Sequence, residues 1–316
     1  MCLAVACAAD APGGGATGSH GPYFEHPMFW NRDVSAAPTA ANSEQLIAAL
    51  RAAGGWGNQD HFRVDFSLDV LRADASDPPQ MFTPTDAFEI PDCDAMPVPV
   101  PATGNVEGEA GYTCSSGGDC HLIVFDEAAG TLYEMWQANI TTTFSGGCLA
   151  AWDTHRAYDE TLRGDQCTSA DAAGFPIAPL LFTADEVASG SIDHAIRFVL
   201  PNDRMTQGFV RPATHASYTS GGLDLPAYGV HLRLRADYPV QTLTSTGAQV
   251  VARALQTYGM YQADGGEDTL TAQSDRYSVA KWDGLLGPQD LYPLRIEDFE
   301  VIDHGPMIPI TNDCQR

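Results

Sequence analysis

Basic and apolar side chains alternate in the stretch AYGVHLRLRADY, residues 227–238, where His231, Arg233 and Arg235 form a basic row. A strand places such a row on one face, and we expect that face to meet solvent or a cleft. Nearby carboxylates are the simpler partners, because the chain has 41 acidic residues and only 16 lysines and arginines. The alternative is an anion-binding strip for a uronic acid or sulfate group, in which Arg233 binds a carboxylate through its guanidinium fork.

Acid–base chemistry is predicted for His215 and Tyr258. β-Elimination in an acidic polysaccharide needs a base beside the sugar carboxylate, a cation that neutralises this carboxylate and a proton donor for the leaving oxygen. Histidine titrates near neutral pH and can be such a base, and His215 shares a predicted strand face with Arg211. We therefore predict His215 as the base and Tyr258 as the donor. An exposed histidine and a core tyrosine are the structural alternatives.

Two carboxylates beside aromatic residues predict a second chemistry, the hydrolysis of a glycosidic bond. Glu134 is flanked by Tyr133 and Trp136, and Asp153 follows Trp152 directly. Aromatic faces stack on sugar rings, and an apolar neighbour raises the pKa of a carboxyl group. Glu134 and Asp153 are therefore the candidate acid pair, with both tryptophans as substrate-binding residues. Surface acids or hydrogen-bonded acids are the structural alternative.

The clearest predicted hairpin joins the segments CHLIVF and TLYEMWQANITTTF through DEAAG, with Gly130 available for a positive φ in the turn. If Asp126 pairs with Thr131, then His121, Glu134 and Trp136 fall on one face. This register adds His121 to the predicted substrate-binding residues.

A second hairpin is predicted from SIDHAIRFVLP, residues 191–201, and GFVRPATHAS, residues 208–217, in which Pro212 favours an edge strand. Asp171 lies near the start of a short predicted helical turn, where a cap or dipole partner is the simpler role.

Helices are predicted over residues 42–54, 183–190 and 245–259, each from its capping residues. The second helix has the Thr183–Glu186 capping box and the third a Thr246–Gln249 box. Many short strands, Gly/Pro-rich turns and few helices predict a mainly β fold, a β-sandwich or jelly roll with a few short helices. We expect one β-rich domain over residues 23–316.

The start of the chain, MCLAVACAADAPGGGATGSHGP, resembles the end of a lipoprotein signal followed by a flexible spacer over residues 1–22, with Cys7 as the lipidated residue. None of the eight cysteines forms a C-x-x-C pair, which makes a zinc ribbon or a thioredoxin-like site improbable. Export would place six cysteines in an oxidising compartment. The connectivity is open in general, but short loops favour two pairs and elimination leaves a third: Cys114–Cys120, Cys148–Cys167 and Cys93–Cys314.

The composition excludes several classes of function. A net charge of −25 disfavours nucleic acid and anionic membrane surfaces as partners, and no later segment is apolar enough to span a bilayer. The chain has no G-x-S-x-G, H-E-x-x-H or Walker motif and no G-x-G-x-x-G motif that follows a predicted strand, so the corresponding hydrolase and nucleotide chemistries are not indicated. We expect no cofactor beyond a structural Ca²⁺ ion, for which acidic loops such as PDCDAMP are suited although no EF-hand pattern is present.

Several segments together resemble a family of exported bacterial proteins: FWNRDVSAAPTAANS, HLIVFDEAAGTLYEMWQA, TSADAAGFPIAPLLFTADEV, RPATHAS and YGMYQADGG. The resemblance implies one domain and an extracellular or envelope location, and it brings no catalytic role. Two departures are Cys167, where the family has a tryptophan, and Cys148, where it has a small residue. Two cysteines that appear together fit a disulfide specific to this chain. The segment WDTHRA also departs from the family's WDLNSN-like loop.

These observations lead to one leading hypothesis and one alternative. The leading hypothesis is a secreted or lipid-anchored enzyme that cleaves a polysaccharide, which is acidic if Arg233 and its neighbours bind it. The alternative is a non-catalytic, lectin-like or adhesive envelope module that stacks sugars on Trp136 and Trp152. The two hypotheses differ in geometry, because only an enzyme requires the polar candidates to converge in one cleft.

Overall fold

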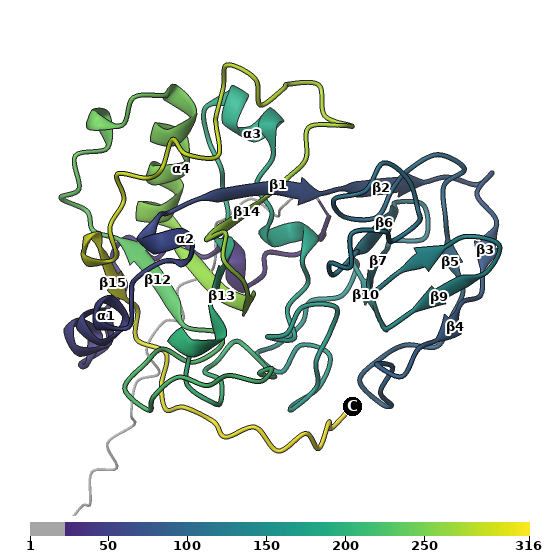
Figure 1. Cartoon of the computed structure of the whole chain (residues 1–316), viewed down its shortest axis with the longest axis horizontal. Coiled ribbons are helices and arrows are strands. Elements are labelled where there is room, and N and C mark those ends of the chain that lie inside the picture. Colours follow the sequence, from purple (N-terminus) through teal and green to yellow (C-terminus); the bar gives the residue numbers. More distant parts are fainter. Residues whose placement is uncertain (1–22) are drawn as a thin grey trace, which may run out of the picture.

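The computed structural model describes residues 23–316, so the predicted signal segment with Cys7 lies outside the described residues. Within this range the chain is mainly β with short helices, which confirms the predicted fold class (Figure 1). The strands of the described residues form two principal sheets and do not close into a barrel.

The larger sheet has six strands and mixes parallel with antiparallel pairs. The pairs β1–β14 and β11–β13 are parallel, whereas β12 is antiparallel to both of its neighbours. In spatial order the strands are β1 (Val64–Leu68), β14 (Leu270–Gln273), β11 (Ile196–Leu200), β13 (Met260–Gly265), β12 (His231–Leu234) and β15 (Phe299–Val301).

The smaller sheet has four strands and contains the first predicted hairpin. Asp126 pairs with Thr131, as predicted, and Gly130 adopts a φ of +59° in the turn. In spatial order the strands are β10 (Cys148–Asp153), β7 (Thr131–Trp136), β6 (Leu122–Asp126) and β2 (Val70–Ala73). Only Asp69 separates β1 from β2, so one nearly continuous segment passes from the larger sheet to the smaller one (Figure 1).

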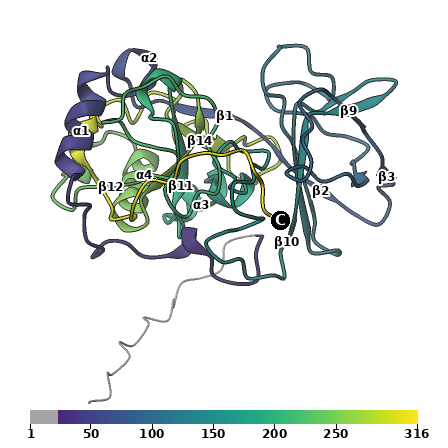
Figure 2. The ribbon, with the colours of Figure 1, turned by 90° about the horizontal axis from the view of Figure 1, so that it is seen from below.

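Two minor sheets lie on the outer side of the four-stranded sheet, where both views show β3 and β9 (Figures 1 and 2). They consist of β3 (Pro79–Gln80) with β5 (Val98–Pro99), and of β4 (Thr83–Pro84), β9 (Phe144–Gly146) and β8 (Asn139–Ile140).

The helices are short and lie mainly on the larger sheet. They are α1 (Ser43–Ala52), α2 (Gly57–Asp60), α3 (Ala184–Ser189) and α4 (Thr246–Thr257), with 3₁₀ turns at Phe29–Asn31, Ala178–Leu180, Asn202–Arg204, Val240–Thr242 and Ile296–Asp298. The Thr183–Glu186 capping box of α3 is confirmed. The predicted Thr246–Gln249 box of α4 is wrong, because the hydroxyl of the preceding Ser245 caps the helix instead.

The second predicted hairpin is also wrong. β11 forms as expected, but residues 208–217 form no strand and have only two isolated bridges, both at Phe209. Pro212 has no N–H to donate, and the amide of Ala213 donates locally to the carbonyl of Val210. β11 pairs with β13 and β14, which come much later in the chain.

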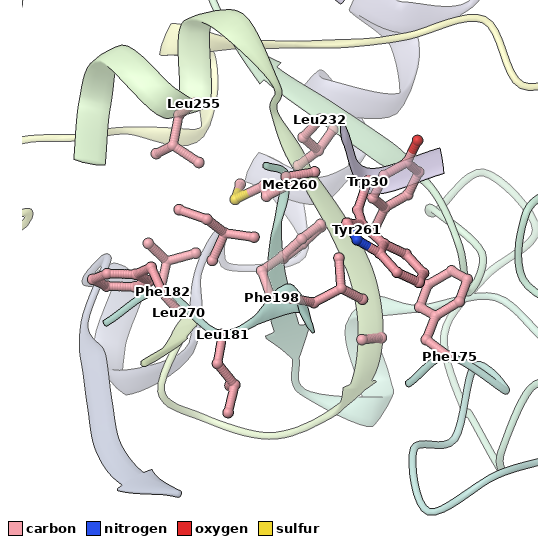
Figure 3. Packing of buried hydrophobic residues seen from close by; sticks show 14 of the residues in the cluster. Trp30, Phe175, Leu181, Phe182, Phe198, Leu232, Leu255, Met260, Tyr261 and Leu270 are labelled. Carbon is pink, nitrogen blue, oxygen red and sulfur yellow. The ribbon is translucent and has the colours of Figure 1, made fainter. Parts of the chain in front are cut away.

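One hydrophobic cluster extends across both sheets. It lies under α4 around Phe198 and Tyr261 (Figure 3) and continues to the inner face of the four-stranded sheet, where Phe125 and Trp152 are buried. A second cluster fills the space on the outer face of this sheet. Burial of each large apolar side chain stabilises the fold by about 1.5–3 kcal/mol, so the shared cluster holds the two sheets together.

The described residues form three disulfides, two of which connect distant parts of the chain. The predicted Cys114–Cys120 bond is confirmed. The other two predicted pairs are wrong, because the bonds are Cys93–Cys148 and Cys167–Cys314. The backbone explains both corrections: Asp94 N donates to Leu149 O beside the first bond, and a bridge between Asp165 and Gln315 brings the C-terminal segment to the second.

The disulfides predict a graded loss of stability. Replacing both cysteines of Cys93–Cys148, which closes a separation of 55 residues, is expected to cost about 4 kcal/mol by loss of the loop constraint on the unfolded chain. Replacing Cys114 and Cys120, only 6 residues apart, is expected to cost about 2 kcal/mol. Urea denaturation of the two double-serine variants measures the difference, and the reverse order would contradict these pairings.

Candidate functional site

The basic row on β12 is not an exposed strip. His231, Leu232, Arg233 and Leu234 are all buried, so the expected exposed face is wrong. Arg233 donates from Nε and Nη2 to Glu300 Oε1 at 2.9 and 2.6 Å, and Glu300 is its partner across β12 and β15. The local carboxylate that composition favoured therefore neutralises the central arginine.

The two neighbours of Arg233 in the row are also held locally. His231 Nε2 lies 2.8 Å from the carbonyl oxygen of Tyr258, and its ring stacks on Tyr261 with centroids 3.9 Å apart. Burial lowers the pKa of His231 to about 4, so this side chain is neutral at physiological pH. Arg235 donates to the carbonyl of Glu297 and keeps 38% of its side chain exposed.

The predicted acid–base pair does not share a hollow with Arg233. His215 Nδ1 lies 2.9 Å from the carbonyl oxygen of Ala172, and burial lowers the pKa of this histidine. Arg211 donates to Asp165 Oδ1 at 2.8 Å. Tyr258 follows the last residue of α4, and burial raises the pKa of its hydroxyl. Each group therefore has its own local partner or packing.

The predicted stacking platforms differ in accessibility. Trp152 is completely buried and donates from Nε1 to Glu134 Oε2 at 3.1 Å, so it cannot stack on a sugar. Trp136 is half-buried and donates to Asp119. Asp153 is exposed at the end of β10, where its carboxylate accepts from the amide of His155. Glu134 and Asp153 therefore occupy different environments, one buried and one exposed.

Residues 167–182, which we call the strap, lie between the two sheets and are bound from both sides. On the side of the four-stranded sheet, Glu134 accepts hydrogen bonds from the amides of Ile177 at 2.8 and 2.9 Å and of Ala178 at 2.7 Å. His121 Nε2 lies 3.0 Å from the carbonyl oxygen of Ala170. On the side of the larger sheet, buried Arg197 donates to Asp171 Oδ1 at 2.8 Å.

The groups around the strap form a buried charge cluster. Arg197 also donates to Thr271 at 2.8 Å and lies 3.9 Å from Asp264 Oδ2. His121 Nδ1 lies 2.7 Å from Glu107 Oε2. Among residues 23–316, four buried polar atoms of this region have no hydrogen-bond partner: Asp171 Oδ2, Arg197 Nε, Tyr228 Oη and Gln262 Oε1.

Burial raises the pKa of two carboxyl groups in the cluster to near neutral pH. Burial raises the pKa of Glu134 to about 7 despite the amides that donate to it. Burial and then the charge of Asp171 raise the pKa of Asp264 to about 7, although a quarter of its side-chain surface is exposed. Burial opposes the charge on His121, but Glu107 outweighs it and raises the pKa of this histidine to about 9. Perturbed groups of this kind mark functional sites as well as structural ion-pair networks.

The cluster includes residues that sequence reasoning missed. His121 and Glu134 were predicted as site residues, and the hairpin register places them together as expected. The predicted helical turn near Asp171 does not form, so the predicted cap role is wrong, and this carboxylate binds Arg197 instead. Asp264 was not predicted at all. The available signal was Arg197 itself, because an arginine within the apolar run IRFVL requires a buried carboxylate.

A cavity of about 670 Å³ opens beside the strap, between the four-stranded sheet and α3; we call it the inter-sheet cavity. None of the predicted site residues lines it. One wall comes from β2 and the segment after β5, and the other from α3 and the chain after β14. Its polar and aromatic lining is Tyr23, Arg72, Asp74, Asp77, Thr103, Thr183, Asp185, Glu186, Gln273, Tyr277 and Ser278.

The lining side chains of the cavity are held in place. Tyr23 donates to Gln273 Oε1 at 3.2 Å. Tyr277 donates to Asn105 Oδ1 at 3.0 Å while 49% of this tyrosine is exposed. His194 lowers the pKa of Glu186 despite burial, so this carboxylate is ionised at neutral pH. The residues that line the cavity follow no periodic pattern in the sequence. Only Thr183 and Glu186 belong to a predicted motif, and that motif predicts a helix start and not a cavity.

A second cavity, of about 530 Å³, lies near the start of α4 and is lined by residues that include Phe66, Trp282 and Asp283. It also contains none of the predicted site residues.

Two groups of side chains in the described residues come close enough to hold a metal ion, Asp92 with Cys167 and Cys314, and Glu109 with Cys114 and Cys120. All four cysteines are in disulfides, which removes the thiolates that would bind a metal. Neither group tests the predicted structural Ca²⁺ ion, which stays a prediction.

Comparisons with protein-family models, with curated proteins and with solved structures give no match. The resemblance to exported bacterial proteins therefore stays a prediction. Within residues 23–316 no helix is both long and apolar enough to cross a membrane.

The Arg233–Glu300 pair predicts a large effect on stability. Glu300→Ala is expected to cost about 3–5 kcal/mol, because it leaves a guanidinium buried without its carboxylate. Arg235→Ala is the matched control, since it removes a partly exposed partner 3.8 Å from the same carboxylate, and is expected to cost less than about 1 kcal/mol. Urea denaturation compares the two variants, and equal losses would contradict a structural role for Arg233.

The charge cluster predicts that stability falls as the pH rises from about 5 to about 9. The folded pKa of both Glu134 and Asp264 lies above the unfolded value, so their contribution is complete below the unfolded pKa and is lost as the pH rises through about 7. His121 has the same sign, with loss through about 9. Glu107 contributes to stability with the opposite sign. Its folded pKa of about 2 lies below the unfolded value, so its contribution is present at neutral pH and is lost only in strong acid.

Urea denaturation at stepped pH measures this profile. Asp264→Asn cannot titrate and is expected to make the decline between pH 5 and 8 shallower. A decline in Asp264→Asn as steep as that of the unmodified chain would show that Asp264 is not protonated as described. The comparison cancels the opposite contribution of His231, whose folded pKa of about 4 lies below its unfolded value.

Proposed function

We propose that the chain is a non-catalytic, extracellular or envelope protein that binds a neutral saccharide in the inter-sheet cavity. The observation that carries this proposal is the cavity itself, whose volume of about 670 Å³ lies within the range of roughly 300–1,000 Å³ typical of small-molecule sites. Three disulfides among the described residues support an oxidising compartment.

The lining suits a sugar. The hydroxyl group of Thr103 and the side-chain N–H groups of Gln273 provide neutral hydrogen-bonding partners, and the hydroxyl oxygen of Ser278 remains an acceptor. The half-exposed ring of Tyr277 is available to pack on the apolar face of a sugar ring. These are the few convergent polar groups and the aromatic surface that a binding site for a small polar molecule requires.

The charge of the lining argues against an acidic glycan. Four carboxylates and one guanidinium line the cavity, and Arg72 is already shared with Glu127 at 3.4 Å. A uronic acid or sulfate would meet net repulsion there. The acidic substrate considered from the sequence depended on Arg233, which Glu300 neutralises.

Binding is better supported than cleavage. A glycosidase or lyase needs its acid, base and charge-neutralising groups around one reacting bond. His215, Arg211 and Arg233 instead have separate local partners, and buried Glu134 is fully engaged with N–H donors.

Calorimetric titration with a panel of neutral and uronic-acid oligosaccharides tests the proposal. At least one neutral saccharide is expected to bind, and Tyr277→Ala is expected to weaken it about 3- to 10-fold, the effect of losing one aromatic contact of about 0.5–1.5 kcal/mol. Tyr277→Phe keeps the ring and is expected to retain most of the affinity.

Asp283→Asn, in the lining of the second cavity, is the matched control and is expected to change nothing. The release of reducing ends or unsaturated products from any glycan would show that the protein cleaves its ligand and would contradict a non-catalytic role. A preference for uronic-acid oligosaccharides, or equal loss in the control, would contradict the assigned cavity.

A further inference from the structure

The strap connects the buried charge cluster directly to the inter-sheet cavity. Its last residue, Phe182, accepts a hydrogen bond from the amide of Gln273, which lines the cavity. The chain then enters α3, where Thr183, Asp185 and Glu186 form part of the cavity wall. The strap is therefore continuous with one wall of the cavity.

Glu134 is surrounded only by hydrogen-bond donors. The amides of Ile177 and Ala178 and the indole N–H of Trp152 all donate to its two oxygens. A carboxylate is acceptor-only and fits these partners, whereas a protonated carboxyl carries an O–H that needs an acceptor. Since Glu134 is completely buried, no water supplies this acceptor. Proton uptake therefore leaves the O–H unsatisfied and weakens the bonds from the three donors, which no longer meet a full negative charge.

We propose that Glu134 and the strap form a proton-operated latch, in which protonation of Glu134 releases residues 177–178 and shifts the cavity wall at residues 183–186. The ionised carboxylate holds the strap against the four-stranded sheet, and the neutral form loosens it while the hydrophobic cluster keeps the sheets together. The latch deepens the proposed function, but its existence does not depend on that function. Only its expected consequence, weaker binding of the ligand in acid, rests on the proposed function.

The charges around Glu134 agree with a transition near neutral pH. The titratable groups that face it are Asp171 from the strap and Tyr23 from the N-terminal segment. Asp171 is paired with Arg197 from β11 and lies near Asp264 from β13, which also interacts with His121. Burial raises the pKa of Glu134 to about 7, so the two states of the latch exchange within the physiological pH range.

Two-dimensional NMR of ligand-free, ¹⁵N-labelled protein between pH 5 and 8.5 tests the latch. The indole cross-peak of Trp152, assigned with Trp152→Phe, is expected to shift with a midpoint near 7, together with the backbone amides of residues 177–178 and 183–186. The indole group of Trp56 donates to the carbonyl of Leu294, away from the strap, so it is an internal control that should not follow this transition.

Glu134→Gln removes the titrating group and is expected to abolish the transition, and Asp264→Asn, which removes the other carboxyl group with a pKa of about 7, is the matched control that should keep it. If Glu134→Gln does not fold, a transition that the Trp152 indole keeps in Asp264→Asn still assigns it to Glu134, and its loss in Asp264→Asn would overturn the latch. A Trp152 peak without a midpoint between pH 6 and 8 would overturn the latch. So would a titrating Trp152 peak with stationary amides at residues 183–186.

The ligand provides a second readout that separates the two proposals. A neutral saccharide found in the panel is expected to bind about 10-fold more weakly at pH 5.5 than at pH 8, and equal affinity would overturn the coupling to the cavity. If no saccharide binds at any pH, the proposed function fails, while the amides of residues 183–186 still decide whether the latch exists.

Discussion

The carboxylate of Glu134 sits in the middle of a hydrophobic cluster shared by two sheets, and it is stable there only because N–H groups from elsewhere in the chain reach it. Isolated charges are not buried in proteins without such partners. The amides of Ile177 and Ala178 and the indole of Trp152 supply them. The position of the strap follows from this requirement, and the wall of the inter-sheet cavity follows from the position of the strap.

Charge is distributed in this molecule so that buried groups neutralise one another locally. Arg233 has Glu300, Arg197 has Asp171 and His121 has Glu107. This arrangement explains why an acidic chain with few cations can bury several arginines, and why the basic row on β12 is structural. It also leaves the ligand-accessible surface of the cavity acidic, which selects against anionic molecules. The same distribution of charge therefore underlies the fold and the proposed preference for a neutral ligand.

Features that depend on residues close together in the sequence were predicted from local patterns. The hairpin register at Asp126 and Thr131, the capping box of α3 and the mainly β class were all readable from spacing. Pairings between distant residues were not, because Glu300 lies 67 residues after Arg233 and Cys148 lies 55 after Cys93. A buried arginine in an apolar strand indicates that a carboxylate must approach it, but not which of 41 acidic residues does so. The inter-sheet cavity likewise depends on how β2 and α3 meet in space.

Native-state hydrogen exchange of the strap tests the central claim most directly. If the buried carboxylate fastens the strap, the amides of Ile177 and Ala178 exchange at pH 8 as slowly as the amides of β11, although they belong to no sheet. Exchange at rates typical of an exposed loop, with β11 still protected, would show that Glu134 does not hold the strap and would contradict this account.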